Sequence, residues 1–219
     1  MNKTLKLCLL YALIVCSAVR VIAQRVDKVI DMGIYKSYYS YEIKNPLYVT
    51  YKLYKGGGPC DRQVEGFSFA KCGEQTATNA DYTNSKYERG HLANAEDFAG
   101  SCALEKQTFC YFNCVPQTYE LNHGKWLEWE GRIRELSQTK HLFIVTGSIF
   151  KDRRIKPGSP VKVPEACYKI VIDEQTGQRL LCMIFPNDQS KSGRDIDFME
   201  LKAMLSYPLV AQNVLNSYQ

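Results

Sequence analysis

The sequence predicts a single α+β domain built on a mainly antiparallel central sheet with flanking helices. Several segments alternate polar and apolar residues as strands do, two of them flank a short turn, and one segment has the 3.6-residue period of a helix. With 219 residues, the chain is long enough for one sizeable core. Its 45% hydrophobic and 23% charged residues are the proportions of a globular protein, which excludes disordered and fibrous classes.

The start of the chain has the layout of a secretory signal peptide. A basic beginning with Lys3 and Lys6 precedes an almost wholly apolar run over residues 7–19. A transmembrane anchor is the alternative, but this run is short for a span of about 20 residues. We therefore expect residues 1–23 to be a signal peptide. The mature domain would then comprise residues 24–219, in an extracellular or periplasmic setting.

Removal of the signal peptide changes both the charge and the cysteine count. The segment carries three basic residues and no acidic one, so the net charge falls from +5 to +2. Such weak charge does not predict nucleic-acid binding, and any phosphate affinity must come from local clusters of Arg and Lys. Of the nine cysteines, seven remain in the mature chain: Cys60, Cys72, Cys102, Cys110, Cys114, Cys167 and Cys182. In an oxidising compartment most would pair, in an order that the sequence does not give, and at least one lacks a partner in the chain. Zinc is the competing use, but the spacings include no C-x-x-C pair.

The predicted elements follow in chain order. We expect strands over residues 46–54, 108–115, 141–150, 168–173 and 179–185, the last two joined as a hairpin around residues 174–177. Residues 60–86 are polar and predict a long loop, which Cys60 and Cys72 could fasten. A closing helix is expected over residues 195–205.

The clearest helix is predicted over residues 123–137. Its apolar residues recur at spacings of three and four and form one stripe: Trp126, Trp129, Ile133 and Leu136. Asn122 precedes the helix and could cap its free N–H groups. At 100° per residue, Glu130 and Arg134 lie one turn apart beside Asn122, whereas Glu128 faces solvent. The simpler interpretation is an ordinary amphipathic helix with an ion pair between Glu130 and Arg134.

Among the three histidines, His91 has the most distinctive neighbours. It lies in the block E-R-G-H-L-A-N-A-E-D-F from Glu88 to Phe98, where a glycine lets the backbone turn beside a base and a cation. His141 opens an apolar strand and is predicted to be structural. His123 is predicted to be exposed to solvent.

Three motifs together carry a resemblance to a known family. The block around His91, followed by N-C-V-P-Q from Asn113 and N-x-G-x-W-x-x-x-E from Asn122, resembles the DNA/RNA non-specific endonuclease family. That family includes secreted bacterial nucleases and mitochondrial endonuclease G. Weaker similarities around residues 145–147, 163–169 and 185–187 extend the resemblance over about residues 45–205. It implies a ββα-metal active site that cuts DNA and RNA with little sequence preference, and a homodimer as in many relatives.

The resemblance also implies a role for each matching residue. His91 would be the general base that takes a proton from water, Asn122 the metal ligand, and Glu130 the residue that orients water at the metal. Arg89 and Arg134 would hold phosphate, Asn113 would support the site, and Arg62 is the candidate for a further substrate-binding arginine. The implied ion is Mg²⁺, with Mn²⁺ or another divalent ion as a substitute. Glu88 stands where the family usually has Asp, so its carboxylate lies one methylene farther from the backbone. It would act by orienting its neighbours.

Elementary chemistry supports these assignments. An imidazole with a pKa near ~6.5 can deprotonate water at neutral pH. An amide oxygen suits a hard cation such as Mg²⁺, and arginines match phosphate oxygens in pairs. Two alternatives stay open: a nucleic-acid-binding protein that kept the fold but lost catalysis, and a Cys–His hydrolase with Cys114 as nucleophile.

Overall fold

The structure, a computed structural model, describes residues 23–209. The predicted signal peptide, residues 1–23, therefore lies almost wholly outside the described residues. Within residues 23–209, no helix is both long enough and apolar enough to cross a bilayer.

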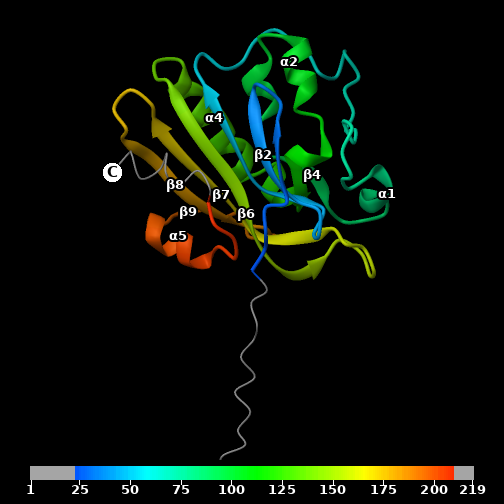
Figure 1. Ribbon diagram of the computed structural model, residues 1–219. Coiled ribbons are helices and arrows are strands. Elements are labelled where there is room, and N and C mark those ends of the chain that lie inside the picture. Colours follow the sequence, from blue (N-terminus) through cyan, green and yellow to red (C-terminus); the bar gives the residue numbers. More distant parts are fainter. Residues whose placement is uncertain (1–22, 210–219) are drawn as a thin grey trace, which may run out of the picture.

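A seven-stranded antiparallel sheet forms the centre of the fold (Figure 1). The strands lie in the order β1 (Lys28–Asp31), β2 (Tyr35–Ser40), β3 (Asn45–Leu53), β6 (Leu142–Arg154), β7 (Lys162–Asp173), β8 (Arg179–Pro186) and β9 (Arg194–Asp195). Every neighbouring pair is antiparallel. This confirms the predicted class, a single α+β domain with a mainly antiparallel sheet.

Four of the predicted strands correspond to β3, β6, β7 and β8. The last two form the predicted hairpin, with Ile170 opposite Cys182. Strands β6 and β7 are longer than predicted because they continue past a register irregularity at Phe150, which lies opposite Pro164. Beyond that point β6 is polar, so its apolar pattern ends before the strand does.

The strand predicted over residues 108–115 is wrong. This stretch forms a 3-10 turn, η3 (Tyr111–Asn113), followed by a short strand, β5 (Cys114–Gln117). All residues from 108 to 117 are buried, so the alternation read from the sequence does not separate an inner face from an outer one. Pro116 does not close the strand but lies within it. A proline is tolerated there because β5 pairs on one side only, with β4 (Glu88–His91).

The main helix is confirmed as α4 (Lys125–Ser137), but it begins two residues later than predicted. A separate short helix, α3 (Tyr119–Asn122), precedes it, and Gly124 is the N-cap of α4. The prediction that Asn122 caps this helix is therefore wrong, because a tight turn at Gly124 intervenes. A Cβ at Gly124 would lie 2.2 Å from the carbonyl oxygen of Glu120, so the turn requires glycine.

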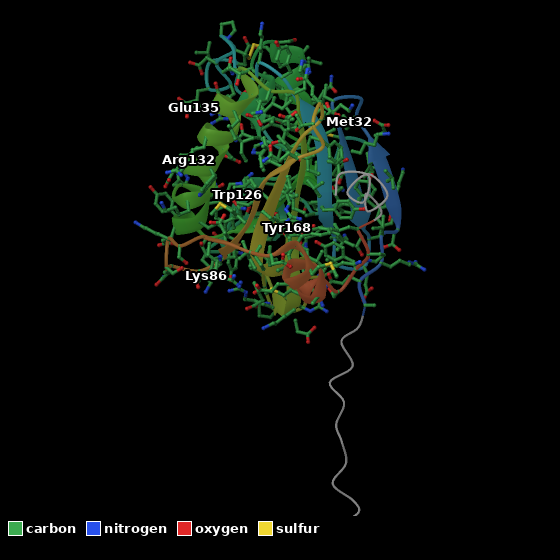
Figure 2. The ribbon with its side chains drawn as sticks, turned by 90° about the vertical axis from the view of Figure 1, so that its left-hand side faces the viewer. Met32, Lys86, Trp126, Arg132, Glu135 and Tyr168 are labelled. Atoms are coloured by element: carbon green, nitrogen blue, oxygen red, sulfur yellow. A yellow bond between two sulfur atoms is a disulfide. The ribbon has the colours of Figure 1, made fainter. Side chains whose placement is uncertain are left out.

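The buried face of α4 is rotated from the predicted stripe. It consists of Trp126, Glu130, Ile133 and Ser137, while Leu136 is exposed. Figure 2 shows Trp126 directed from the helix toward the sheet, with Arg132 and Glu135 on the outer side. A carboxylate thus occupies a position of the buried face where an apolar residue would be expected, which already marks Glu130 as unusual.

The remaining helices are short and surround the sheet. They are α1 (Asn79–Tyr82), η2 (Ala95–Phe98), α2 (Cys102–Gln107) and α5 (Phe198–Met204). Helix α5 matches the closing helix predicted over residues 195–205, and Asp197 caps its first turn. Figure 1 shows α5 next to β8 and β9, and α4 behind the sheet.

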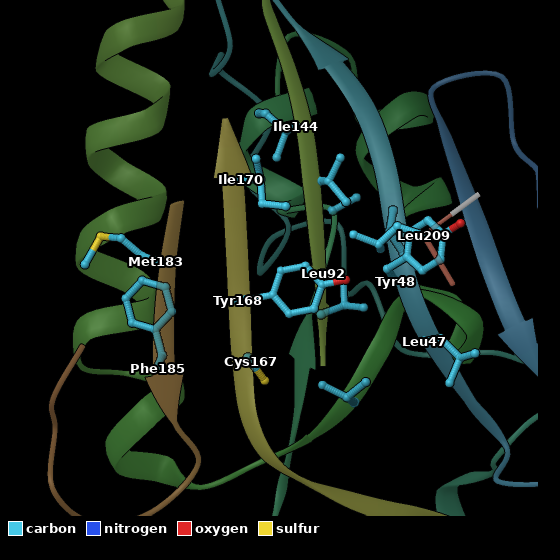
Figure 3. Packing of buried hydrophobic residues seen from close by; sticks show 14 of the residues in the cluster. Leu47, Tyr48, Leu92, Ile144, Cys167, Tyr168, Ile170, Met183, Phe185 and Leu209 are labelled. Atoms are coloured by element: carbon cyan, nitrogen blue, oxygen red, sulfur yellow. The ribbon is translucent and has the colours of Figure 1, made fainter. Parts of the chain in front are cut away.

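Alternate residues of β7 face opposite sides of the sheet. Tyr168 packs on the side away from α4, where its hydroxyl lies 3.1 Å from that of Tyr207, and Figure 3 shows it beside Tyr48 and Leu209. Lys169, the next residue, faces α4 and is fully buried. This alternation places a lysine inside the layer that contains the functional residues.

One side chain joins the small β4–β5 sheet to the large one. The Asn187 amide, just after β8, donates to the carbonyl oxygens of Pro116 (2.9 Å) and Pro164 (3.0 Å). Its oxygen accepts from the backbone N–H of Thr118 at 2.8 Å. The site described below is therefore fixed relative to the core of the protein.

The long loop predicted over residues 60–86 is mostly irregular, with α1 as its only described helix. Two disulfides fasten it, Cys60–Cys102 and Cys72–Cys110, so each loop cysteine pairs with the α2 region and not with the other. The other three cysteines within residues 23–209, Cys114, Cys167 and Cys182, are free and buried.

Candidate active site

The site is built on the β4–β5 pair. In this pair His91 lies opposite Cys114, and Gly90 lies opposite Val115. A Cβ at Gly90 would lie 1.9 Å from Oε1 of Gln117, so only glycine allows the Gln117 side chain to cross β4. The glycine before His91 thus serves close packing inside a strand.

His91 is held between two phenylalanines. Its ring centroid lies 4.7 Å from that of Phe69 and 4.8 Å from that of Phe109. The Nε2 edge is shielded from solvent and has no hydrogen-bond partner among residues 23–209. Burial, with a further contribution from the Arg62 guanidinium, lowers the pKa of His91 to about 3. The imidazole is therefore neutral at physiological pH, but it is a weaker base than the imidazole of pKa ~6.5 on which the sequence-based assignment relied.

The start of α4 docks on the end of β4. Nε1 of Trp126 donates to the carbonyl oxygen of His91 at 3.2 Å. This contact fixes the helix so that Glu130 and Arg134, one and two turns later, face the same cavity as His91. The Glu128 carboxylate instead pairs with Lys125 and Arg132 on the outer surface, as predicted.

A cavity of about 450 Å³, here called the His91 pocket, brings these side chains together. Its lining residues are Arg62, His91, Asn94, Ala95, Glu96, Phe109, Asn122, His123, Leu127, Glu130 and Arg134. Five of the residues singled out from the sequence are among them: Arg62, His91, Asn122, Glu130 and Arg134.

Glu88 lies beneath one wall of the pocket and fixes Asn122. Its Oε2 accepts a hydrogen bond from Nδ2 of Asn122 at 2.8 Å and lies 3.0 Å from Nε2 of His123. With the amide nitrogen held in this way, the amide oxygen of Asn122 remains free for a cation. Glu88 is one methylene longer than the family's usual Asp, and its carboxylate still forms a direct hydrogen bond with Asn122.

Arg134 is anchored by a buried carboxylate. Its Nη1 lies 2.9 Å from Oδ1 of Asp97 and 3.3 Å from Oδ1 of Asn94. Burial raises the pKa of Asp97 to about 6 against the opposing effect of Arg134. The ion pair predicted between Glu130 and Arg134 is replaced by these contacts across the fold.

Glu130 has a buried partner of its own. Its Oε1 lies 3.9 Å from Nζ of Lys169, and this ammonium lies 3.6 Å from the centroid of the Trp126 ring. Burial raises the pKa of Glu130, and the Lys169 charge opposes that rise. Burial likewise lowers the pKa of Lys169, against the effect of Glu130. The opposite charges and the burial of both side chains favour a coupled pair, although at 3.9 Å the two groups are not joined by a hydrogen bond.

Arg62 reaches the pocket from the disulfide-fastened loop. Its Nη1 lies 4.0 Å from the fully buried Glu105 carboxylate, and 43% of its side chain is exposed. The sequence had left the position of this arginine uncertain because the loop is long, and the structure places it in the pocket wall.

Two residues predicted for the site lie elsewhere. Asn113 is fully buried behind the pocket, where its amide exchanges hydrogen bonds with the backbone of Ala93 at 2.9 Å and also donates to Thr108. It braces the segment after His91 and does not line the cavity. Arg89 lines a second cavity, whose lining includes the Phe69 ring that contacts His91.

The sequence analysis missed several members of the site. Asn94 lies within the block around His91 and lines the pocket, so its place in that block was the available signal. His123 is exposed, as predicted, but also lines the pocket and pairs with Glu88. Asp97, which pairs with Arg134, lies in the same block and had the same signal. Lys169 meets Glu130 through a contact between distant segments, for which the sequence offers no local signal.

Comparison with known proteins identifies the family of the chain. Residues 18–206 match a family described as DNA/RNA non-specific endonuclease. Mitochondrial endonuclease G of Bos taurus is 33% identical over 125 residues, which cover 51% of this chain and 42% of that protein. A nuclease of Nostoc sp. is 38% identical over 95 residues, covering 42% of this chain and 33% of that protein. The chain thus spans less than half the length of these curated relatives.

A solved structure shows a similar fold. The crystal structure of an EndoG/EndoGI complex superposes with a TM-score of 0.67 and 21% identity, covering 80% of this chain and 82% of that one. At this identity the likeness concerns the fold alone. The family match, in contrast, runs through β4, β5 and α4 and covers most of the chain. The chain belongs to the DNA/RNA non-specific endonuclease family.

Proposed function

We propose that this protein hydrolyses phosphodiester bonds of DNA and RNA with little sequence preference, using a divalent metal ion. The observation that carries the proposal is the His91 pocket, which combines a neutral histidine, a free amide oxygen, a buried carboxylate and two arginines. Each is a group that phosphodiester hydrolysis needs: a base, a cation ligand, a water-orienting acceptor and phosphate donors.

His91 is the general base in this proposal. Its low pKa keeps the ring unprotonated, and Nε2 has no competing partner among the described residues. The Phe69 and Phe109 rings hold the imidazole in place. Because the His91 ring also lines the pocket, a water placed there would give its proton to the ring as it attacks phosphorus.

The pocket suits a hard cation better than zinc. Asn122 offers one amide oxygen, and Mg²⁺ is often bound through few protein ligands and several waters. Within residues 23–209 no group of three or more His, Cys, Asp or Glu side chains could hold a metal, as a zinc site would require. Members of this family typically depend on a divalent metal. When bound, Mg²⁺ or Mn²⁺ would neutralise charge on the phosphate and on the leaving 3′ oxygen.

The cations in the pocket would bind the substrate. Arg134 and Arg62 can each donate to phosphate oxygens. Asp97 holds the guanidinium of Arg134 by a hydrogen bond, whereas Glu105 lies 4.0 Å from that of Arg62 and acts on it only through charge. Arg89 would bind phosphate from the adjacent cavity. Contacts of this kind are made to the sugar–phosphate backbone of the nucleic acid and do not depend on its base sequence. Asn113 and Glu88 act as positioning residues, through Ala93 and Asn122.

A Cys–His hydrolase fits the structure poorly. Cys114 is fully buried, and burial raises the pKa of its thiol to about 12. A thiol in this state is protonated at neutral pH and is a weak nucleophile. The second candidate remains a protein that binds nucleic acid without cutting it.

The proposal includes secretion and leaves a homodimer as an expectation. The two disulfides support an oxidising compartment. The bovine relative is named as mitochondrial, so location must be measured on this chain. Detection of mature protein in the culture medium after expression in a host with a secretion pathway tests the location, and light scattering tests the oligomeric state.

Metal removal is the first test of the activity. We expect purified mature protein to degrade supercoiled plasmid and RNA in Mg²⁺, and EDTA in excess to abolish both reactions. Gel electrophoresis of timed samples measures the loss of full-length substrate. An inert protein that still binds DNA in a salt-dependent manner would instead favour the binding-protein candidate.

Substitution of Glu130 by glutamine is expected to lower kcat more than it weakens substrate binding. The change keeps the size of the side chain but removes the charge that orients water in the pocket. Cleavage kinetics and anisotropy of a fluorescent oligonucleotide in EDTA would measure the two effects separately. Glu128→Gln, on the outer face of the same helix, is the matched control. Equal loss of affinity with unchanged kcat would contradict the assigned role.

A further inference from the structure

A second cavity lies beside the His91 pocket, and Arg89 is the only residue of its lining that the proposed function places on the substrate. It has a volume of about 490 Å³ and is here called the Arg89 pocket; it is lined by Phe67, Ser68, Phe69, Asn79, Arg89 and Tyr111. Arg89 and His91 are two residues apart on β4, so they leave the strand on the same face about 6.6 Å apart.

An aromatic wall joins the two pockets. The Phe69 ring lies 4.7 Å from His91, 5.3 Å from Phe109 and 5.7 Å from Tyr111, centroid to centroid. The Phe67 ring meets Phe109 edge to face at 5.4 Å. His91 and Phe109 line the first pocket, whereas Phe67, Phe69 and Tyr111 line the second. A ligand that passes from one pocket to the other therefore follows aromatic surface.

This wall is formed in advance. The Cys72–Cys110 disulfide and an isolated bridge between Ala70 and Cys110 hold the Phe67–Phe69 segment against the η3 turn. The backbone N–H of Ala70 donates to Phe109 at 3.0 Å, and that of Tyr111 donates to Ala70 at 2.9 Å. Phe67 and Phe69 nevertheless stay partly exposed, in a segment whose other side chains are mainly in solvent.

Arg89 has no carboxylate partner among residues 23–209, unlike Arg62 and Arg134. Its guanidinium lies 4.8 Å from the centroid of the Tyr82 ring and donates to the side-chain oxygen of Asn79. A neutral amide and an aromatic face orient this cation without neutralising it. The pocket thus presents an uncompensated positive charge beside flat apolar rings, which complements a nucleotide.

We propose that the Arg89 pocket binds the nucleotide next to the cleaved phosphodiester, with its unpaired base on Phe67 and Phe69 and its phosphate on Arg89. This inference rests on the proposed function and names a substrate class for it. A base can reach the phenylalanines only when it is not paired within a duplex. The protein therefore favours single-stranded nucleic acid over duplex of the same sequence.

The test compares, by anisotropy in EDTA, the affinities for a fluorescent strand that does not fold on itself and for the same strand annealed to its complement. We expect Phe67→Leu to reduce the ratio of single-strand to duplex affinity about tenfold, the loss typical of one base–aromatic stack. Val64→Ser, in the same segment but 81% exposed and outside both pockets, is the matched control and should leave the ratio unchanged. An equal loss of affinity for both DNAs, or an unchanged ratio in Phe67→Leu, overturns the proposal.

A substrate change provides a second measurement that does not depend on the variant folding. A single strand with abasic sites keeps every phosphate but lacks the bases to be stacked. The wild-type protein should bind it about tenfold more weakly than the intact strand, whereas equal affinities overturn the proposal. Because both measurements are of binding in EDTA, they give an answer even if the protein proves not to cleave, which would count only against the proposed function.

Discussion

His91→Ala is expected to reduce cleavage of plasmid DNA and RNA by roughly 100- to 10 000-fold, the usual contribution of a general base. The binding of a fluorescent oligonucleotide in EDTA should change little, because the arginines of the pocket remain. Initial rates under saturating substrate measure the first quantity, and anisotropy measures the second. His141→Ala is the matched control, since His141 stacks on Tyr54 at 3.8 Å, outside the pocket. Cleavage that survives His91→Ala at the wild-type rate would remove His91 from the mechanism.

The pH dependence of His91 sharpens this expectation. With a pKa of about 3, His91 stays unprotonated between pH 5 and 7, so its protonation should not lower the cleavage rate in this range. An exposed histidine would titrate near ~6.5. The same shift affects stability. Because the folded state resists the proton that the unfolded state accepts, stability falls as the pH decreases from about 6.5 toward 3. His91→Ala should remove this part of the pH dependence, which urea unfolding at several pH values would show.

Lys169→Met is expected to lower the free energy of unfolding by about 3–5 kcal/mol, because it leaves the buried Glu130 carboxylate without its counter-charge. Methionine fills nearly the same space, so the loss reflects charge and not a cavity. The pKa of Glu130, already raised by burial, should rise further without the lysine. The loss of unfolding free energy in Lys169→Met is therefore largest above the pKa of Glu130. It shrinks as the pH falls through that pKa, because protonation removes the buried charge of Glu130.

Urea unfolding of Lys169→Met at pH 8 and pH 5 measures both expectations. The double variant Glu130→Met with Lys169→Met should recover most of the stability, since it removes both buried charges together. Lys36→Met is the matched control, because Lys36 pairs with Asp31 at a site where both side chains are 53% exposed and the expected change is below about 1 kcal/mol. A loss as small as in the control, or equal at the two pH values, would show that Lys169 and Glu130 are not a coupled pair.

Local patterns predicted those parts of the fold and the site that depend on nearby residues. The hairpin of β7 and β8 and the span of α4 follow from periodicity, and the helical rotation placed Glu130 and Arg134 on one flank. Periodicity fails as a guide where every residue is buried, as in residues 108–117, because no polar face then reveals the period of the element. Periodicity also led to the wrong prediction that Asn122 caps α4. The turn at Gly124 depends on a close approach to the backbone of Glu120, which the sequence pattern does not indicate.

The remaining features depend on contacts between distant segments. The alternation in β7 is apolar on both faces, so nothing local indicates that Lys169 faces α4 and meets Glu130. Similarly, strand geometry places Arg89 and His91 on one face, but nothing local indicates that they line different cavities or that the Phe69 ring, contributed by a loop about twenty residues earlier, contacts His91. Such contacts are decided by the fold as a whole.

The two disulfides have a consequence for the cell that makes this protein. Both fasten the loop that contributes Arg62 to one pocket and Phe67 and Phe69 to the other. In a newly made chain with reduced thiols, the sheet would still support His91 and α4. The loop that carries Arg62, Phe67 and Phe69 would not be covalently fastened. Completion of the site is thereby coupled to oxidation. If the chain is secreted as proposed, the pocket walls that this loop forms would be completed only in the oxidising compartment and not in a reducing cytosol.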